Sequence, residues 1–228
     1  MTRVLVLGAG TGAATNLMRS LRAGEPALRL IGVHDDRFVL AKSAADRNYV
    51  VPAPGHRRFA AALRAVVDRE RVDLVIPSTD AEVALLSGLR GRLRGRLFLP
   101  RPTVIARCQD KYALIALLAR RGVPVAPARA LRRPGDVGVA FRALAGRPLW
   151  CRLRRGTGSA GAVPVRTPAQ ARAWIHYWET MRGVPPGAFM LSEYLPGRDF
   201  ACQTLWRDGR LVLAKVAERL TYFGGASQ

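Results

Sequence analysis

Cysteine is scarce in this sequence, with three residues among 228. Cys108, Cys151 and Cys202 lie far apart, their number is odd, and no two of them have the CxxC spacing. A disulfide framework or a zinc cluster needs more cysteines at closer and more regular spacing. The scarcity of cysteine therefore argues against both and favours a reducing, cytoplasmic setting.

Long apolar runs are missing as well. No stretch approaches the roughly 20 uninterrupted apolar residues that a membrane-spanning helix needs. The first three residues lead straight into a strand-like segment, without the apolar region or cleavage site of a signal peptide. We therefore predict no membrane partner. Apolar residues nevertheless make up 49% of the chain, enough to bury a core in one large domain or two small ones.

Acidic residues are few, 16 against 37 basic ones, which gives a formal net charge of +21. Such a charge suits nucleic acid, an anionic membrane or a polyanionic ligand. The basic residues, however, are nearly all arginine and are spread along the chain, as a GC-rich coding sequence produces without functional demand. No basic segment is interleaved with aromatics as a stacking platform for single strands would be. We therefore do not predict a nucleic-acid partner.

Histidine is scarce too, and the three histidines have no metal-ligand spacing. They are His34, His56 and His176. His176 lies between two tryptophans on a predicted helix, where packing is its expected role. The sequence thus predicts no metal-ligating residue.

The first half of the chain alternates short apolar runs with helical patterns. Strands are predicted over residues 3–7, 28–33, 49–51, 73–77 and 97–99, and helices over 13–22, 59–69 and 79–89. This alternation is typical of a doubly wound parallel sheet with right-handed crossovers. A stretch rich in Gly, Arg and Pro at 91–102 marks a boundary. We assign residues 1–107 to one α/β, Rossmann-like domain.

The second half has an α+β pattern. A helix is predicted over 110–121, then a strand over 125–131, a helix over 137–144 and a strand over 148–153. A glycine-rich loop at 154–161 leads to a short strand and a helix beginning at Pro168. Strands follow at 189–194, 199–206 and 211–217, and Asp208-Gly209 between the last two is a hairpin signal.

Two glycine-rich segments are candidates for phosphate binding. The first, residues 8–13 (Gly-Ala-Gly-Thr-Gly-Ala), follows the first strand and opens a helix, and Asp35 and Asp36 close the second strand. That arrangement suits a nicotinamide dinucleotide cofactor. The alternative is that a doubly wound sheet needs a tight first turn in any case and that the aspartates cap a helix.

The second segment, residues 152–161, reads Arg-Leu-Arg-Arg-Gly-Thr-Gly-Ser-Ala-Gly. Glycine frees backbone N–H groups to fold over an anion, and hydroxyls and guanidinium groups can satisfy its oxygens. No Gly-Lys-Ser/Thr ends the loop, so it is not a Walker A motif. The alternative is a flexible surface hairpin.

This run resembles the strand and loop of ATP-grasp ligases of the carbamoyl-phosphate-synthase large-chain type, written Lys-Pro-Arg-Arg-Gly-Ser-Gly-Ser-Arg-Gly. Three further segments match in order: Asp110-Lys111-Tyr112 with the helix it opens, the hinge-like residues 192–200 (Ser-Glu-Tyr-Leu-Pro-Gly-Arg-Asp-Phe), and Glu218-Arg219-Leu220 with Gly224-Gly225-Ala226-Ser227. The N-terminal sheet resembles the pre-ATP-grasp domain. The resemblance implies a pre-ATP-grasp domain (1–107), an ATP-grasp lid subdomain (108–190) and the beginning of an ATP-grasp core (191–228).

The resemblance also implies an ATP site. Arg152 stands where the family has a phosphate-neutralising lysine, and Arg154 follows it; Lys111 is the second phosphate-facing cation or, equally, a surface lysine. The loop over the β- and γ-phosphates would comprise Gly156, Thr157, Gly158, Ser159 and Gly161. Adenine would lie along Glu193, Tyr194 and Leu195, and Asp199 would receive the ribose hydroxyls.

Departures from the family pattern limit what is expected. Arg152 and Leu153 replace Lys-Pro, and Ala160 replaces an arginine. The acidic and Asn residues that hold Mg²⁺ in the family lie further along than Gln228, so we expect little turnover from this polypeptide by itself, and a homodimer or a C-terminal partner segment as its partner. The implied reaction activates a small carboxylate with ATP for attack by an amine. The alternatives are a non-catalytic nucleotide-binding module of the same fold and an NAD(P)-binding Rossmann protein. No catalytic residue is assigned.

Overall fold

The computed structural model describes residues 1–146, 148–220, 222–223 and 226–227. The chain divides into two compact units, Met1–Ala106 and Arg107–Gln228. Gly224 and Gly225, which the family resemblance places in a turn, lie outside the described residues.

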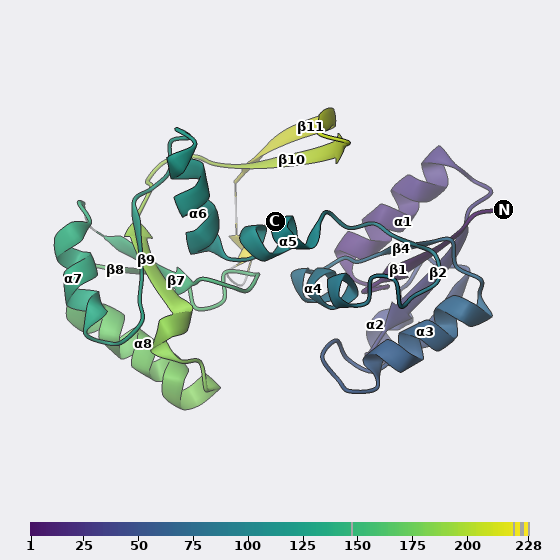
Figure 1. Cartoon of the computed structure of the whole chain (residues 1–228), viewed down its shortest axis with the longest axis horizontal. Coiled ribbons are helices and arrows are strands. Elements are labelled where there is room, and N and C mark those ends of the chain that lie inside the picture. Colours follow the sequence, from purple (N-terminus) through teal and green to yellow (C-terminus); the bar gives the residue numbers. More distant parts are fainter. Residues whose placement is uncertain (147, 221, 224–225, 228) are drawn as a thin grey trace. The chain divides into compact units, whose positions relative to one another are not determined.

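The first unit is a five-stranded parallel sheet with strand order β3-β2-β1-β4-β5. Figure 1 shows α1 and α3 on its two faces, so the sheet is doubly wound as predicted. The predicted strand and helix positions are confirmed within a few residues. Its elements are β1 (Arg3–Leu7), α1 (Gly12–Gly24), β2 (Arg29–His34), α2 (Arg37–Leu40), β3 (Arg47–Val50), α3 (Phe59–Arg69), β4 (Leu74–Ile76), α4 (Asp80–Gly88), β5 (Arg96–Leu97) and the start of α5 (Pro102–Cys108).

The core of this unit follows from the alternation of side chains along β1. Val4 and Val6 face α1 and pack with its buried Met18. Leu5 and Leu7 face the other way and pack with α3, whose apolar residues recur at helical spacing. Because both faces of β1 are covered, the strand is apolar throughout, as a central parallel strand should be.

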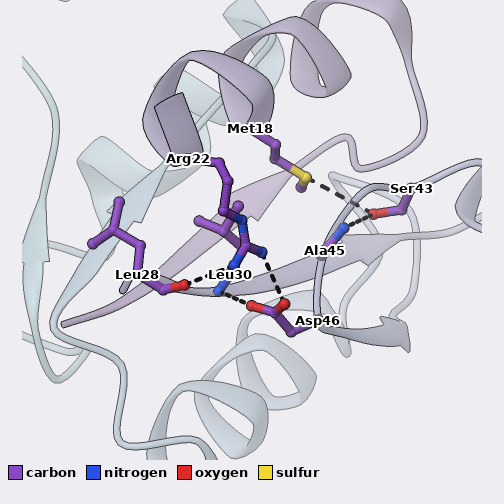
Figure 2. A network of polar contacts seen from close by, with 7 residues as sticks. All are labelled: Met18, Arg22, Leu28, Leu30, Ser43, Ala45 and Asp46. Carbon is purple, nitrogen blue, oxygen red and sulfur yellow. Dashed lines mark hydrogen bonds and ion pairs between the residues drawn. The ribbon is translucent and has the colours of Figure 1, made fainter. Parts of the chain in front are cut away.

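A polar network joins α1 to the start of β2 and to the loop before β3 (Figure 2). Arg22 of α1 donates to the carbonyl of Leu28 at 3.2 Å and to Asp46 at 2.8 Å, and the second oxygen of Asp46 accepts from the Leu30 N–H at 2.7 Å. Burial by itself would raise the pKa of Asp46, but the Leu30 N–H and the Arg22 guanidinium outweigh it and hold the pKa below its usual value.

The second unit is built on a four-stranded antiparallel sheet, order β6-β9-β7-β8, and a long hairpin. Helices α7 and α8 cover one face of this sheet (Figure 1) and share its buried core. The elements are α6 (Lys111–Arg120), β6 (Ala128–Ala130), α7 (Asp136–Ala143), β7 (Leu149–Leu153), β8 (Val163–Val165), α8 (Pro168–Arg182), η1 (Pro186–Ala188), β9 (Phe189–Glu193), β10 (Asp199–Arg207), β11 (Arg210–Arg219), β12 (Tyr222–Phe223) and β13 (Ala226–Ser227).

The hairpin prediction at Asp208-Gly209 is confirmed. Arg207 pairs with Arg210, and the two turn residues have φ of +50° and +79°, the pattern of a type I′ turn. Most side chains of β10 and β11 are exposed. The predicted strand at 125–131 is shorter in the structure, where β6 comprises three residues.

Candidate nucleotide-binding site

The face of the four-stranded sheet opposite α7 and α8 presents Arg152. Along β7, Leu149 and Cys151 are buried in the core, whereas Trp150 and Arg152 point to the opposite face. Arg152 lies opposite Met190 of β9. Its guanidinium makes no hydrogen bond or ion pair within the described parts of the chain, and partial burial lowers its pKa. A half-buried cation of this kind suits an anionic ligand.

The glycine-rich loop connects β7 to β8, and two of its glycines have room for a side chain. Gly156 and Gly158 have φ of +116° and +62°, and no heavy atom lies within 4 Å of where a Cβ would stand. Gly161 differs, because a Cβ there would approach the Leu153 side chain at 2.9 Å. Close packing against Leu153 therefore explains why residue 161 is glycine. At Gly156 and Gly158, packing does not require glycine, and what glycine provides there is backbone freedom.

The rest of the loop turns back on itself. The Ala160 N–H donates to the Thr157 carbonyl at 3.3 Å, and the Ala162 N–H donates to the Ser159 carbonyl at 3.0 Å. Ser159 has a φ of +55°, which is uncommon for a residue with a side chain. The two predicted hydroxyl residues thus lie in consecutive tight turns at the loop tip.

Asp110 ties the base of this loop to α6. Its carboxylate caps the helix by accepting from the Ala113 N–H and also accepts from Nε and Nη2 of Arg154 at 3.3 and 2.7 Å. Burial would raise the pKa of Asp110, but the Ala113 N–H, Arg154 and Arg155 outweigh burial and lower it. Sequence reasoning identified Asp110 only as a cap, because no local pattern indicates a partner 44 residues away.

Lys111 lies against the same loop. Its backbone N–H donates to the Arg154 carbonyl at 2.9 Å, and its Nζ donates to the Gly156 carbonyl at 2.6 Å. Lys111, Arg154 and Gly156, predicted separately from two motifs, are therefore together in the structure. A depression of about 450 Å³ opens beside them and is lined by Asp110, Leu153, Arg154, Arg155, Val184, Gly187 and Ala188.

The predicted adenine-edging residues lie at the other end of β7. Strand β9 runs antiparallel to β7, so that Glu193 pairs with Leu149 while Phe189 pairs with Leu153, the last residue before the loop. The ring of Tyr194 lies 5.8 Å from that of Trp150. The glycine-rich loop and Tyr194 are thus on neighbouring strands but at opposite ends, with Arg152 on the strand between them.

Tyr194 lines a larger depression, of about 820 Å³. Its lining is mainly apolar and aromatic, consisting of Pro148, Val163, Pro164, Val165, Arg166, Gln170, Ala173, Trp174, Tyr177 and Tyr194. Trp174 and Tyr177 stack with ring centres 5.8 Å apart, and Trp174 donates to the Gly161 carbonyl at 3.0 Å. Sequence reasoning did not identify this aromatic lining. The pattern that could have indicated it is the spacing of Trp174 and Tyr177, three residues apart and therefore on one face of the helix that follows Pro168.

Glu193 and Leu195 have less distinctive surroundings. The Glu193 N–H donates to the Pro127 carbonyl at 3.0 Å, and its carboxylate accepts from the Ala145 N–H at 3.2 Å. The backbone N–H and the carboxylate of Glu193 therefore already have protein partners. Leu195 is 71% exposed, so its backbone and side chain are accessible to a ligand.

Asp199 is the first residue of β10 and belongs to the hairpin. Its carboxylate accepts from Arg219 of β11 at 3.4 Å. Next to it, Arg198 donates twice to Glu218, at 2.6 and 2.7 Å, which lowers the pKa of Glu218. These pairs hold the two strands together at the base of the hairpin, and Asp199 does not lie on the sheet that carries Arg152.

The other glycine-rich segment, at residues 8–13, is accounted for by packing within the first unit. A Cβ at Gly8 would collide with the hydroxyl of Ser78, and one at Gly10 with the carbonyl of Val39. Asp36 caps α2 through the N–H groups of Phe38 and Val39. These contacts support the structural alternative for this turn over the nicotinamide-cofactor alternative.

No helix among the described residues is both long and apolar enough to cross a bilayer. No group of three or more His, Cys, Asp or Glu side chains in the described ranges could hold a metal ion.

Comparisons with known proteins agree with this architecture. No protein-family model matches the chain. The chain is 30% identical over 139 residues to a probable alpha-L-glutamate ligase of Stutzerimonas stutzeri, which is 58% of this chain and 45% of that protein. Among solved structures it is similar to the L-amino acid ligase of Bacillus licheniformis, with a TM-score of 0.72, 13% identity, and coverage of 96% of this chain and 50% of that one.

A third relative has a nucleotide in its structure. The biotin carboxylase domain of the 2-oxoglutarate carboxylase of Hydrogenobacter thermophilus, solved with MgADP, ADP and bicarbonate, matches with a TM-score of 0.66 and 15% identity. The match covers 87% of this chain and 45% of that one, so the chain spans about half the length of the relatives it matches. The solved structures to which the chain is similar are ATP-grasp proteins, and the chain shares their mixed α/β fold.

Proposed function

We propose that this chain is the nucleotide-binding part of an ATP-grasp ligase. The proposed reaction transfers the γ-phosphoryl group of ATP to a small carboxylate, and an amine or similar nucleophile then displaces phosphate from the acyl phosphate. The observation that carries the proposal is the position of Arg152 on the strand that leads into the glycine-rich loop, half-buried and without a hydrogen-bond or ion-pair partner among the residues that the structure describes. The names of the relatives support a ligase, but they belong to proteins about twice as long.

The donors near the loop have the chemistry that a triphosphate requires. Lys111 is held at the loop by its bond to the Gly156 carbonyl, and Arg155 is largely exposed. Arg152 adds a third cation further along β7. Guanidinium and ammonium groups donate only, which matches phosphate oxygens that only accept. The residues present therefore fit the phosphates of ATP.

Arg154 has a different role in this proposal. Because its guanidinium makes a two-point contact with Asp110, it anchors the loop base rather than meeting a phosphate. The backbone N–H of Arg154 also donates to the Ala188 carbonyl at 2.8 Å. Together these contacts fix the position at which the loop leaves β7. Beyond this anchor, the backbone freedom of Gly156 and Gly158 allows the loop to close over a ligand and exclude water.

A nucleotide that reached both predicted ends of the site would lie along β7. Its phosphates would meet the glycine-rich loop, its middle would pass over Arg152, and its base would lie near Tyr194. Antiparallel pairing of β7 and β9 supports this arrangement. Glu193, the residue before Tyr194, pairs with Leu149, which lies five residues, or roughly 16 Å, from Arg154 at the start of the loop.

Magnesium is not assigned to residues of this chain. The described residues include no cluster of acidic side chains that fits a magnesium pair. We propose that the metal ligands and the groups that bind the acid and the amine come from a C-terminal partner segment or from a second copy in a homodimer. The chain's own residues then bind and orient the nucleotide.

Binding of a fluorescent ATP analogue to the full chain tests this function. Arg152→Ala should weaken binding about tenfold or more, because a charge-assisted contact contributes roughly 1.5–3 kcal/mol. Arg172→Ala is the matched control, since Arg172 is an exposed residue of α8 in the same unit. Equal affinity of the two variants would refute the role of Arg152, and a folded parent that binds no adenine nucleotide would refute the function.

The second candidate is a nucleotide-binding module without catalysis. The lack of an acidic cluster in the described residues favours it specifically. It predicts analogue binding that is unchanged when Mg²⁺ is removed, and no phosphate release from ATP when carboxylate and amine mixtures are added. Binding that strengthens strongly with Mg²⁺ would favour the ligase instead.

A further inference from the structure

Five arginines converge at the edge of the first unit where its parallel strands begin. Arg3 and Arg29 are the first residues of β1 and β2 and are paired in register, and Arg47 is the first residue of β3. Arg69 and Arg71 come from the end of α3. The topology therefore collects residues from four elements at one edge, although nothing in the sequence groups them.

These arginines line a depression of about 440 Å³. Its lining consists of Met1, Arg3, Arg29, Arg47, Arg69, Glu70 and Arg71. Five of seven lining residues are arginine, whereas lysine and arginine together make up 37 of the 228 residues of the chain. The concentration at this edge is therefore well above what the composition alone would give.

Glu70 is the carboxylate in this lining, and it is already satisfied. It is 8% exposed, accepts from the Tyr49 hydroxyl, and pairs with Arg47 at 3.3 Å. Bonding to Tyr49 and the charge of Arg47 outweigh its burial and lower its pKa, so that Glu70 is ionised. One negative charge thus faces five positive ones.

Two further carboxylates lie nearby, and the charge of one of them, Asp46, also acts on Arg29. Asp46 is held by Arg22 and by the Leu30 N–H (Figure 2), and Asp73 accepts from the Arg3 N–H at 2.8 Å. Neither residue lines the depression.

The guanidinium groups differ in how far they are engaged. Arg3 donates to the Glu70 carbonyl at 3.3 Å, and Arg69 lies over the Tyr49 ring at 5.7 Å. Arg29 and Arg71 donate no side-chain hydrogen bond to any residue in the described ranges. Cations near a helix C-terminus are favourable, which accounts for Arg69 and Arg71. Arg47 and Arg3 contact the carboxylate and the carbonyl of Glu70, so Arg29 is the strand-starting arginine without a side-chain hydrogen bond in the described ranges.

We propose that this depression binds a linear oligophosphate, either free or as the phosphate chain of a nucleotide. Planar guanidinium groups contact phosphate oxygens in pairs, and several of them can neutralise successive phosphates. The lining is mainly polar, so a ligand recognised by its phosphates fits better than one with a large apolar body. The volume lies within the range of small-molecule sites, roughly 300–1,000 Å³.

This site is distinct from the glycine-rich loop. The loop belongs to the unit Arg107–Gln228, whereas the arginine-lined depression lies wholly within Met1–Ala106. It also lies at the end of the parallel strands opposite to the one where doubly wound sheets usually bind ligands. The proposal therefore stands or falls independently of the proposed ligase function.

Titration calorimetry of the full chain with tripolyphosphate tests the proposal. The variant Arg29→Gln with Arg71→Gln should bind at least tenfold more weakly than the parent. The matched control is Arg19→Gln with Arg57→Gln, which removes the same charge from exposed positions of the same unit and should stay within about twofold of the parent. Equal losses in both double variants, or no binding to the parent at millimolar tripolyphosphate, would overturn the proposal.

Arg71→Gly separates binding from folding. Arg71 has a φ of +50°, where glycine is less strained than arginine. This variant should therefore fold at least as well as the parent and still bind tripolyphosphate several-fold more weakly. Unchanged affinity in a folded Arg71→Gly variant would contradict the proposed site.

Parallel titrations identify the source of the phosphates. If the Arg29 and Arg71 double variant also loses affinity for ATP, the site accepts a nucleotide's phosphate chain; if only tripolyphosphate binding falls, it takes the free anion. Both outcomes support an oligophosphate site. Loss confined to binding of a DNA or RNA oligonucleotide, with tripolyphosphate unaffected, would overturn it in favour of a nucleic-acid surface.

Discussion

Gly10 and Gly12 belong to the same turn but have different surroundings. Gly10 has a φ of +90° and packs against the Val39 carbonyl, whereas Gly12 lies in the first turn of α1 with open space around it. Gly10→Ala should destabilise the first unit by about 3 kcal/mol, since it combines backbone strain with overpacking. Gly12→Ala should be within about 1 kcal/mol of neutral or stabilising. Urea unfolding measures both, and equal effects would refute the packing account.

At the residue scale, Asp110 also predicts a pH dependence. Its pKa is lower in the folded chain than the unfolded value of about 3.9. The stabilisation it gives is therefore complete above that unfolded value and is lost as the pH falls through the lower, folded pKa. Asp110→Asn keeps a good helix cap but removes the charge that Arg154 meets.

We expect Asp110→Asn to cost about 1–3 kcal/mol at pH 7, because the partly buried Arg154 loses its charged partner. The difference from the parent should shrink as the pH falls below about 4. Unfolding free energies measured from pH 7 to pH 3 check this, with Asp68→Asn as an exposed control that should stay within about 0.5 kcal/mol. A difference independent of pH would contradict the role of the charge.

At the scale of the element, α8 depends on its first turn. Thr167 accepts from the Gln170 N–H at 3.2 Å, and the Gln170 side chain accepts in return from the Thr167 N–H, which forms a capping box. Thr167→Ala should therefore cost about 1 kcal/mol. Thr180→Ala in the same helix should have little effect, because its hydroxyl donates only to carbonyls of the preceding turn. Thermal unfolding of the two variants makes the comparison.

The sequence predicted elements best where one pattern decided them. Helix 59–69 was predicted with the bounds that α3 has, because its apolar residues recur at helical spacing and pack on one face. The strand at 125–131 was overestimated, since β6 ends where its pairing with β9 ends. Helix α2 was not predicted, because four residues are too few for a periodic pattern.

At the scale of the whole molecule, each unit has its own buried core. The clusters around Leu5 and Val4 lie in the first unit, and the cluster around Leu149 lies in the second. Units with separate cores can unfold separately. Gly10→Ala should therefore lower the midpoint temperature of the calorimetric transition of the first unit only. Leu149→Ala should destabilise the second unit by about 2–5 kcal/mol and lower the midpoint temperature of its transition only. Equal shifts of a single transition by both variants would show one cooperative unit instead.

The candidate site was predictable in its members but not in their arrangement. Arg152 and the loop glycines stand out in the sequence itself, whereas Lys111 follows from the resemblance to ATP-grasp ligases. Their mutual positions, and the use of Arg154 to hold Asp110, depend on strand pairing and on contacts 44 residues apart. The role of Asp199 in nucleotide binding stays a prediction.

The sequence by itself determined the fold class, because the segment of β1 is apolar throughout and the strands alternate with helical patterns, which together favour a parallel sheet with helices on either side. It also determined the order of the motifs for which we propose phosphate binding. Only the tertiary structure decided that the strand-starting arginines gather at one edge, that Gly10 serves packing, and that the glycine-rich loop and Tyr194 occupy opposite ends of one strand pair. The physical reason is that local propensity acts over a few residues, whereas strand register brings together residues that the chain keeps far apart.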